Sequence, residues 1–235
     1  MMKNGIDVSK YQGNIAWKQV KDSGIDFAII KAGGSDDGFY TDPTFEANYK
    51  NAKAVGMPVG AYYIVGSLCV SEADGIADAE RFLKMLEGKT FEYPVYIDLE
   101  LTSPATKSGT TDAVLAFCRT MEQAGYFCGV YASDISGFKD RLELSRLKTR
   151  ALWVASYDSM PKYVSSYGIW QKSSTGRVPG IVGDVDLDEC YTDYPAIIKS
   201  RGDNGFPKPE QPKRKTLKVT LELDDHTYSG LLEEQ

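Results

Sequence analysis

The feature that most constrains the fold is a regular alternation of strand-like and helix-like segments over roughly the first 140 residues. Short apolar runs typical of buried strands begin near residues 5, 26, 58, 93 and 127. Between them, apolar residues recur every three or four positions, and glycine follows several of these helical stretches. Strand–helix–strand repeats predict parallel pairing with right-handed crossovers. The fold class is therefore α/β.

The later part of the chain loses this rhythm. Strand-like runs recur at residues 152–157, 168–171 and 185–187, and about ten residues separate them, too few for a full crossover helix. The total is eight strands with about five helices. This count predicts an irregular TIM-like β/α barrel with incomplete helical cover, rather than an open doubly wound sheet. In such barrels the active site lies at the carboxyl ends of the strands.

The fourth predicted strand, residues 93–100, ends in two acids separated by one leucine. Because side chains alternate along a strand, Asp98 and Glu100 project to the same side, with backbones about 6.6 Å apart. Glycoside-cleaving carboxyl pairs need a separation of several ångströms. Repulsion and burial raise the pKa of at least one such acid, as a general acid requires. The alternative is a strand end that simply meets solvent in two acids.

Composition excludes several classes of function. The net charge is −6 and the pI is near 5.0, so no general attraction to nucleic acid is expected. No apolar run reaches the ~18 residues of a membrane span. The single histidine, His226, lies near the C-terminus, which argues against a Ser-His-Asp nucleophile and multi-histidine zinc chemistry. No metal or cofactor is expected, and an enzyme of this composition would work through carboxylates.

The cysteines lack CxxC spacing, so we expect free thiols at Cys69, Cys118, Cys128 and Cys190. The N-terminus enters a strand at once, which predicts synthesis in the cytoplasm without a signal peptide.

The composition changes past residue 199. We expect a catalytic domain over 1–200, a proline-containing polar linker over 201–215 and a β-hairpin tail over 216–235. A lone hairpin is marginal in water, so it should dock on the barrel, on a second copy or on a partner.

Several segments together resemble one known family. They are residues 5–13 (GIDVSKYQG), 60–63 (GAYY), the acid-x-acid strand 93–100, and residues 129–131, 152–157, 169–171 and 185–188. In this order they resemble the glycoside hydrolase family 25 lysozymes, muramidases that include many bacteriophage endolysins. The resemblance covers about residues 4–195. The chain departs from the family at Tyr63, where histidine is frequent, and at Asp188, where asparagine is common.

The resemblance implies a barrel of five β/α units extended by three strands. It also implies cleavage of the β-1,4 bond between N-acetylmuramic acid and N-acetylglucosamine in peptidoglycan. Glu100 would be the general acid, Asp98 would orient or assist, and Asp7 and Asp186 would complete an acidic floor. Five further side chains are expected to line a sugar cleft or, alternatively, to fill the barrel wall: Tyr62, Tyr131, Trp153, Tyr157 and Gln171.

Other interpretations stay open at this stage. The chain would be an endolysin released by a separate holin-type protein that permeabilises the membrane, or a catalytically silent wall-binding or assembly protein on the same scaffold, or a glycosidase acting on a substrate such as chitin. Retention and inversion are both open. The tail over 216–235 would mediate self-association or be a truncated wall-binding module.

Overall fold

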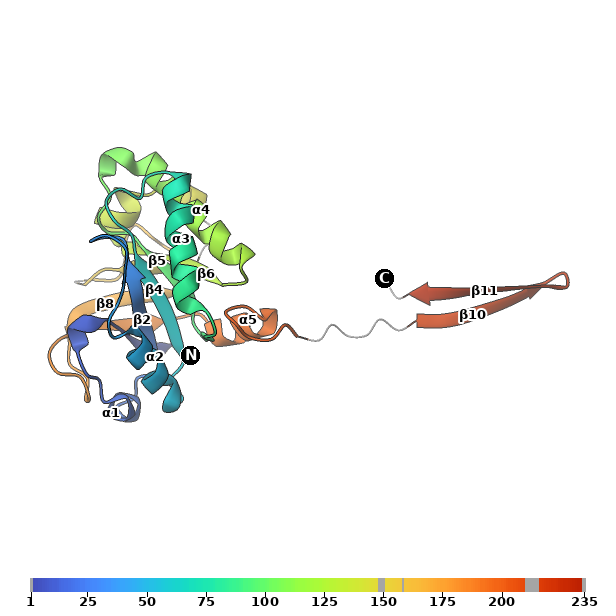
Figure 1. Cartoon of the computed structure of the whole chain (residues 1–235), viewed down its shortest axis with the longest axis horizontal. Coiled ribbons are helices and arrows are strands. Elements are labelled where there is room, and N and C mark those ends of the chain that lie inside the picture. Colours follow the sequence, from blue (N-terminus) through green and yellow to red (C-terminus); the bar gives the residue numbers. More distant parts are fainter. Residues whose placement is uncertain (1, 148–150, 158, 210–215, 234–235) are drawn as a thin grey trace.

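The computed structural model describes residues 2–147, 151–157, 159–209 and 216–233. Within these residues it contains a closed eight-stranded barrel, five α-helices against it and a C-terminal hairpin (Figure 1). The predicted irregular α/β barrel with a hairpin tail is confirmed.

The barrel strands are β1 (Lys3–Val8), β2 (Phe27–Gly34), β4 (Val59–Ile64), β5 (Val95–Asp98), β6 (Cys128–Ser133), β7 (Ala151–Ala155), β8 (Ile169–Gly176) and β9 (Val185–Cys190), with the short β3 (Tyr40–Thr41) beside β2. The α-helices are α1 (Trp17–Asp22), α2 (Phe45–Ala54), α3 (Glu72–Leu86), α4 (Lys107–Gln123) and α5 (Tyr194–Arg201). Shorter turns of helix lie at Lys10–Gln12, Pro104–Thr106, Asp134–Lys139 and Leu144–Leu147.

Strands β1 and β9 close the barrel. β1 pairs in parallel with β2 on one side and antiparallel with β9 on the other. β9 is also antiparallel to β8, whereas the strands from β2 through β4 to β8 run parallel. The antiparallel pairing explains why no helix lies between β8 and β9, since an antiparallel neighbour needs no crossover helix. The closure places Asp7 directly opposite Asp186 in the strand register.

Apolar side chains form two cores. One fills the barrel interior and includes Phe27, Tyr96, Tyr131 and Trp153. The larger one lies between the barrel and its helices. All of β2 is buried, as expected for a parallel strand covered on both faces.

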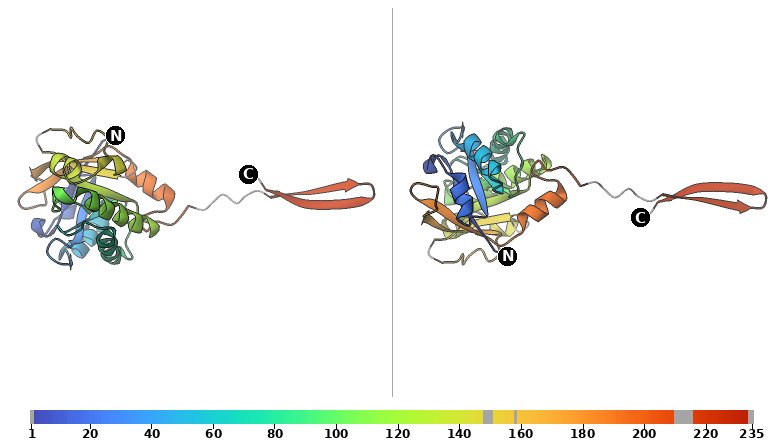
Figure 2. Two further views of the ribbon diagram at one scale, coloured as in Figure 1. Left: turned by 90° about the horizontal axis from the view of Figure 1, so that it is seen from above. Right: turned by 90° about the horizontal axis from the view of Figure 1, so that it is seen from below.

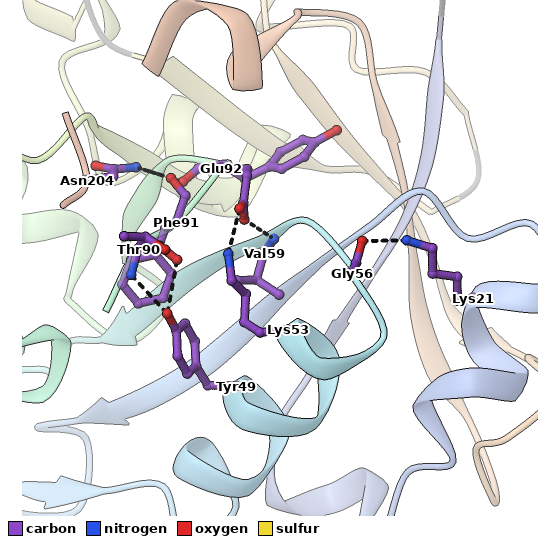
Figure 3. A network of polar contacts seen from close by, with 10 residues as sticks. Lys21, Tyr49, Lys53, Gly56, Val59, Thr90, Phe91, Glu92 and Asn204 are labelled. Carbon is purple, nitrogen blue, oxygen red and sulfur yellow. Dashed lines mark hydrogen bonds and ion pairs between the residues drawn. The ribbon is translucent and has the colours of Figure 1, made fainter. Parts of the chain in front are cut away.

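The amino-terminal end of the barrel is closed by side chains from distant segments (Figure 3). Glu92 pairs with Lys53 and accepts the backbone N–H of Val59. Asn204 is fully buried; its amide donates to the carbonyls of Phe91 and Tyr93 and its side-chain oxygen accepts the N–H of Phe127. Asn204 belongs to the segment that the sequence predicts as a linker, so this part of the segment is attached to the barrel.

The hairpin pairs β10 (Thr216–Leu223) with β11 (His226–Glu233) and stands apart from the barrel in all three views (Figures 1 and 2). Leu221, Leu223 and Tyr228 are each more than half exposed, and Leu221 lies opposite Tyr228. Among the described residues, no helix is long and apolar enough to cross a membrane.

Candidate active site

The predicted acids converge at one end of the barrel, where the parallel strands have their carboxyl ends and the antiparallel β9 begins. Asp7 lies near the end of β1, Asp98 is the last residue of β5, and Glu100 follows it after one buried leucine. Asp186 lies on β9, across the barrel closure from Asp7. Strands β1, β5 and β9 bring these acids to the same end of the barrel, so barrel closure concentrates negative charge there. We call the four side chains the acidic floor.

Asp98 and Glu100 form a contacting carboxyl pair. Asp98 is 4% exposed, Glu100 is exposed, and their side chains are in hydrogen-bonding contact. Burial, and then the charge of Glu100, raises the pKa of Asp98 well above its usual value. Although the Glu100 side chain is exposed, neighbouring groups displace part of the water around its carboxyl, which raises its pKa, while the positive charge of Lys31 and the hydrogen bond to Asp98 oppose the rise. Such a pair favours holding one proton between its two members.

Lys31 is the buried cation beside this pair. It is 8% exposed on β2, and its ammonium group lies over the rings of Tyr40 and Tyr62, 5.6 Å and 5.9 Å from their centres. Its charge lowers the pKa of both Asp98 and Glu100. Lys31 therefore limits the cost of keeping the acid pair charged.

Asp7 is held by a chain of side-chain hydrogen bonds. The amide of Gln171 donates to Asp7 Oδ2 over 2.7 Å. The amide oxygen of Gln171 in turn accepts the hydroxyls of Tyr131, at 2.8 Å, and Tyr157, at 3.0 Å. Burial and the charges of Asp188 and Asp186 raise the pKa of Asp7 well above its usual value, against the effect of Gln171.

A cavity of about 490 Å³ opens beside this floor. Its size suits a small-molecule or sugar ligand. It is lined by Glu100, Tyr131, Ser133, Asp134, Ile135, Ser136, Arg141, Ala155, Ser156 and Tyr157. Of the four predicted acids, Glu100 lines the cavity. Asp7 and Asp98 are buried, and the half-buried Asp186 is not among the lining residues. Glu100 is thus the acid placed to reach a bound molecule.

The predicted sugar-binding side chains divide by burial. Tyr157 is 51% exposed, Tyr131 lines the cavity with its ring mostly buried, and Tyr62 is half-buried. Trp153 is 1% exposed and packs against the rings of Tyr62, Tyr96 and Tyr131.

Because Trp153 is buried among these rings, its position favours the second alternative given for it, that it fills the barrel and does not stack on a sugar. Gln171 is 3% exposed, and its bonds run inward to Asp7 and the tyrosines rather than to the cavity.

Sequence reasoning misses one acid beside the floor, Asp188. It is 1% exposed, and its Oδ1 accepts the indole N–H of Trp153 over 2.8 Å. From the sequence, Asp188 is noted only as a departure from the family and is given no role in the site. A signal is present, because Asp186 and Asp188 have the same acid-x-acid spacing on a strand as Asp98 and Glu100. Among the described residues, no group of His, Cys, Asp and Glu has a geometry that could hold a metal ion.

A closed α/β barrel with clustered carboxyls of raised pKa and a cavity of this size fits the class of carboxylate-dependent glycosidases. The chain matches the model of glycosyl hydrolases family 25 over residues 6–181, so it belongs to this family.

It is similar to the autolytic lysozyme of Clostridium acetobutylicum, with 32% identity over 79% of this chain and 55% of the relative. It is also similar to lysozyme M1 of Streptomyces globisporus, with 30% identity over 79% of this chain and 66% of the relative. Among solved structures, the CTP1L endolysin superposes with a TM-score of 0.72 and 29% identity, covering 84% of this chain and 69% of that one. The chain thus spans between about half and two thirds of the length of these two lysozymes.

Proposed function

We propose that the protein is a peptidoglycan hydrolase of the lysozyme type, which cleaves the β-1,4 bond between N-acetylmuramic acid and N-acetylglucosamine. The observation that carries the proposal is Glu100, whose carboxyl faces the cavity while the buried Asp98 carboxyl contacts it. The relatives named lysozymes support this choice of substrate.

In this proposal Glu100 protonates the leaving glycosidic oxygen. The raised pKa values of Glu100 and Asp98 keep a proton available near neutral pH, as a general acid needs. As positive charge develops on the anomeric carbon, the carboxyl groups of Asp98, Asp7 and Asp186 stabilise it electrostatically. Tyr62, Tyr131 and Tyr157 would hold the sugar rings.

The contact between Asp98 and Glu100 bears on stereochemistry. Inverting glycosidases hold their two carboxyls about 6.5–9.5 Å apart to admit a water molecule. Two carboxyls in hydrogen-bonding contact leave no such space. We therefore propose that Asp98 orients the substrate and stabilises charge, rather than activating water as the base of an inverting pair.

The test compares wild-type protein with Glu100→Gln and Glu80→Gln on purified Gram-positive cell walls, following turbidity and new reducing ends together. Glu80 is an exposed glutamate on α3 and provides the matched control. We expect Glu100→Gln to lower the rate by about 10²–10⁴-fold and Glu80→Gln to leave it unchanged. Clearing that persists in Glu100→Gln would reject Glu100 as the acid. Absence of clearing by wild type on several wall types would favour a silent scaffold, and cleavage of chitin oligomers would favour another glycosidase.

We also propose that the barrel, residues 1–200, carries the activity and that the tail, residues 216–235, mediates self-association with the tail of a second copy. A two-stranded hairpin is marginal alone, and three or more strands with a shared apolar face are more stable. The exposed Leu221, Leu223 and Tyr228 provide such a face. Access to the wall through a separate holin-type protein belongs to the same proposal. A chain ending at Pro209 that keeps the oligomeric state of the full chain in light scattering would reject the role of the tail.

A further inference from the structure

Asp188 has a buried carboxyl, and one of its two oxygens has no hydrogen-bond donor among the described residues. Its Oδ1 accepts the Trp153 indole N–H over 2.8 Å. Its Oδ2 is buried, and no donor of the described residues reaches it. The Asp188 side chain is in hydrogen-bonding contact with the carboxyl of Asp7. Two acceptors in contact cannot satisfy each other unless a proton lies between them.

The hydrogen bond that Asp7 accepts from Gln171 does not remove the need for a proton between the Asp7 and Asp188 carboxyls. It is 5% exposed, and the donor that reaches it, Gln171 Nε2, is bonded to Oδ2. Turning the Gln171 amide over would place its oxygen against the Asp7 carboxylate, and two acceptors would then face each other, so this donor stays on Oδ2. A pair of contacting, buried carboxylates would carry two like charges in a low dielectric, which strongly favours keeping one proton.

The surroundings do not provide enough positive charge to ionise both acids. Several charged and titratable groups face the pair. They are the acids Asp98 on β5 and Asp186 on β9, the cation Lys172 on β8, and the neutral groups Tyr62, Tyr96, Tyr131, Tyr157 and Cys190. Lys172 is the one cation of this set, and it already pairs with Glu189 over 2.6 Å. Asp98 and Asp186 add further negative charge.

We propose that Asp7 and Asp188 share one proton through neutral pH, and that Asp188 is a positioning residue which, with this proton, holds the Asp7 carboxyl in the acidic floor. The pair then carries a single negative charge, anchored at one end by Trp153 and at the other by Gln171. For its effect on activity this inference rests on the proposed glycosidase function. The protonation state itself does not depend on that function.

The structure suggests a matched pair of variants. In Asp188→Asn, the amide oxygen accepts the Trp153 N–H and the amide nitrogen donates to Asp7, which reproduces the protonated pair permanently. In Asp188→Ala, both bonds are lost and the indole N–H is left without an acceptor. The asparagine variant therefore separates loss of the acid from loss of the hydrogen bonds.

The first readout is infrared difference spectroscopy of wild type and Asp188→Asn at neutral pH, which does not require activity. We expect the carbonyl band of a protonated carboxylic acid in wild type to be lost in the variant. Spectra without that difference would overturn the proposal, and so would failure of Asp188→Asn to fold, since the variant keeps both hydrogen bonds.

The second readout is the pH profile of wall hydrolysis. At neutral pH, Asp188→Asn should be more active than Asp188→Ala, because it keeps both hydrogen bonds, and it should lose the part of the alkaline decline that comes from ionisation of the pair. Asp188→Ala should fall by about 10²-fold at every pH, because Asp7 is no longer held in place. An Asp188→Asn variant as weak as Asp188→Ala at neutral pH would overturn the positioning role. If wild type itself fails to act on walls, the proposed function fails, and the infrared comparison still decides the shared proton.

Discussion

Replacing Asp186 with asparagine should stabilise the protein at alkaline pH while lowering its activity. Asp186 is half-buried on β9, and burial, with a contribution from the charge of Glu100, raises its pKa from 3.8 to about 6. A tenfold change in proton affinity corresponds to about 1.4 kcal/mol. The rise in the pKa of Asp186 means that its ionised form costs the folded state at most about 3 kcal/mol. Because solvent still reaches this side chain and screens its charge, we expect about 1–2 kcal/mol.

The sign follows from proton binding. Between about pH 4 and pH 6 the folded protein binds more protons at Asp186 than the unfolded chain does, so stability falls as the pH rises through this window. Above it the cost is fully present, and below it the carboxyl is neutral in both states. Asparagine is neutral at every pH, so the free energy of unfolding of Asp186→Asn should exceed that of wild type by more as the pH rises through this window.

The assay is guanidinium unfolding of wild type and Asp186→Asn at about pH 4 and about pH 8. We expect little difference at the lower pH and a gain of about 1–2 kcal/mol at the higher one. Asp184→Asn is the control, since Asp184 forms an exposed ion pair with Arg177 and its loss should change stability by at most about 1 kcal/mol. A gain that does not depend on pH, or a variant less stable than wild type at pH 8, would refute the burial argument.

Three further substitutions test contacts outside the reaction itself. Trp153→Phe removes the donor to the buried Asp188 Oδ1, so the free energy of unfolding should fall by about 1–3 kcal/mol in chemical denaturation. Asn204→Ala removes the bonds to three backbone groups and should cost about 3 kcal/mol; an unchanged unfolding midpoint would show that this segment does not anchor the barrel. Gly75→Ala places a Cβ 2.0 Å from the Ala113 carbonyl oxygen, so α3 and α4 must separate. Its melting temperature should drop, whereas alanine at an exposed helical site would raise it.

The local parts of the site can be predicted from the sequence. Asp98 and Glu100 lie on one strand, and the two-residue period of a strand fixes their relation without any other segment. Helix limits are similarly readable, because Gly56, Gly88 and Gly125 each adopt a positive φ just after a helix. The family resemblance predicts Tyr131 at the site, and this residue lines the cavity.

The relations that cross the barrel are harder to predict. Asp188 lies opposite Gly5 because β9 is antiparallel to β1, and nothing in the local pattern of residues 185–188 indicates that neighbour. The burial of Trp153 and Lys31 likewise depends on how many strands surround the interior.

By itself, then, the sequence determined the order of the strands and helices, the barrel class and the acid pair on β5, because each depends on periodicity over a few residues. Only the tertiary structure decided which acids share a proton, which aromatic rings face the cavity and where the barrel ends at Asn204. Those properties depend on burial and on contacts between residues far apart in the chain, such as Asp7 with Gln171, and these contacts exist only once the barrel has closed.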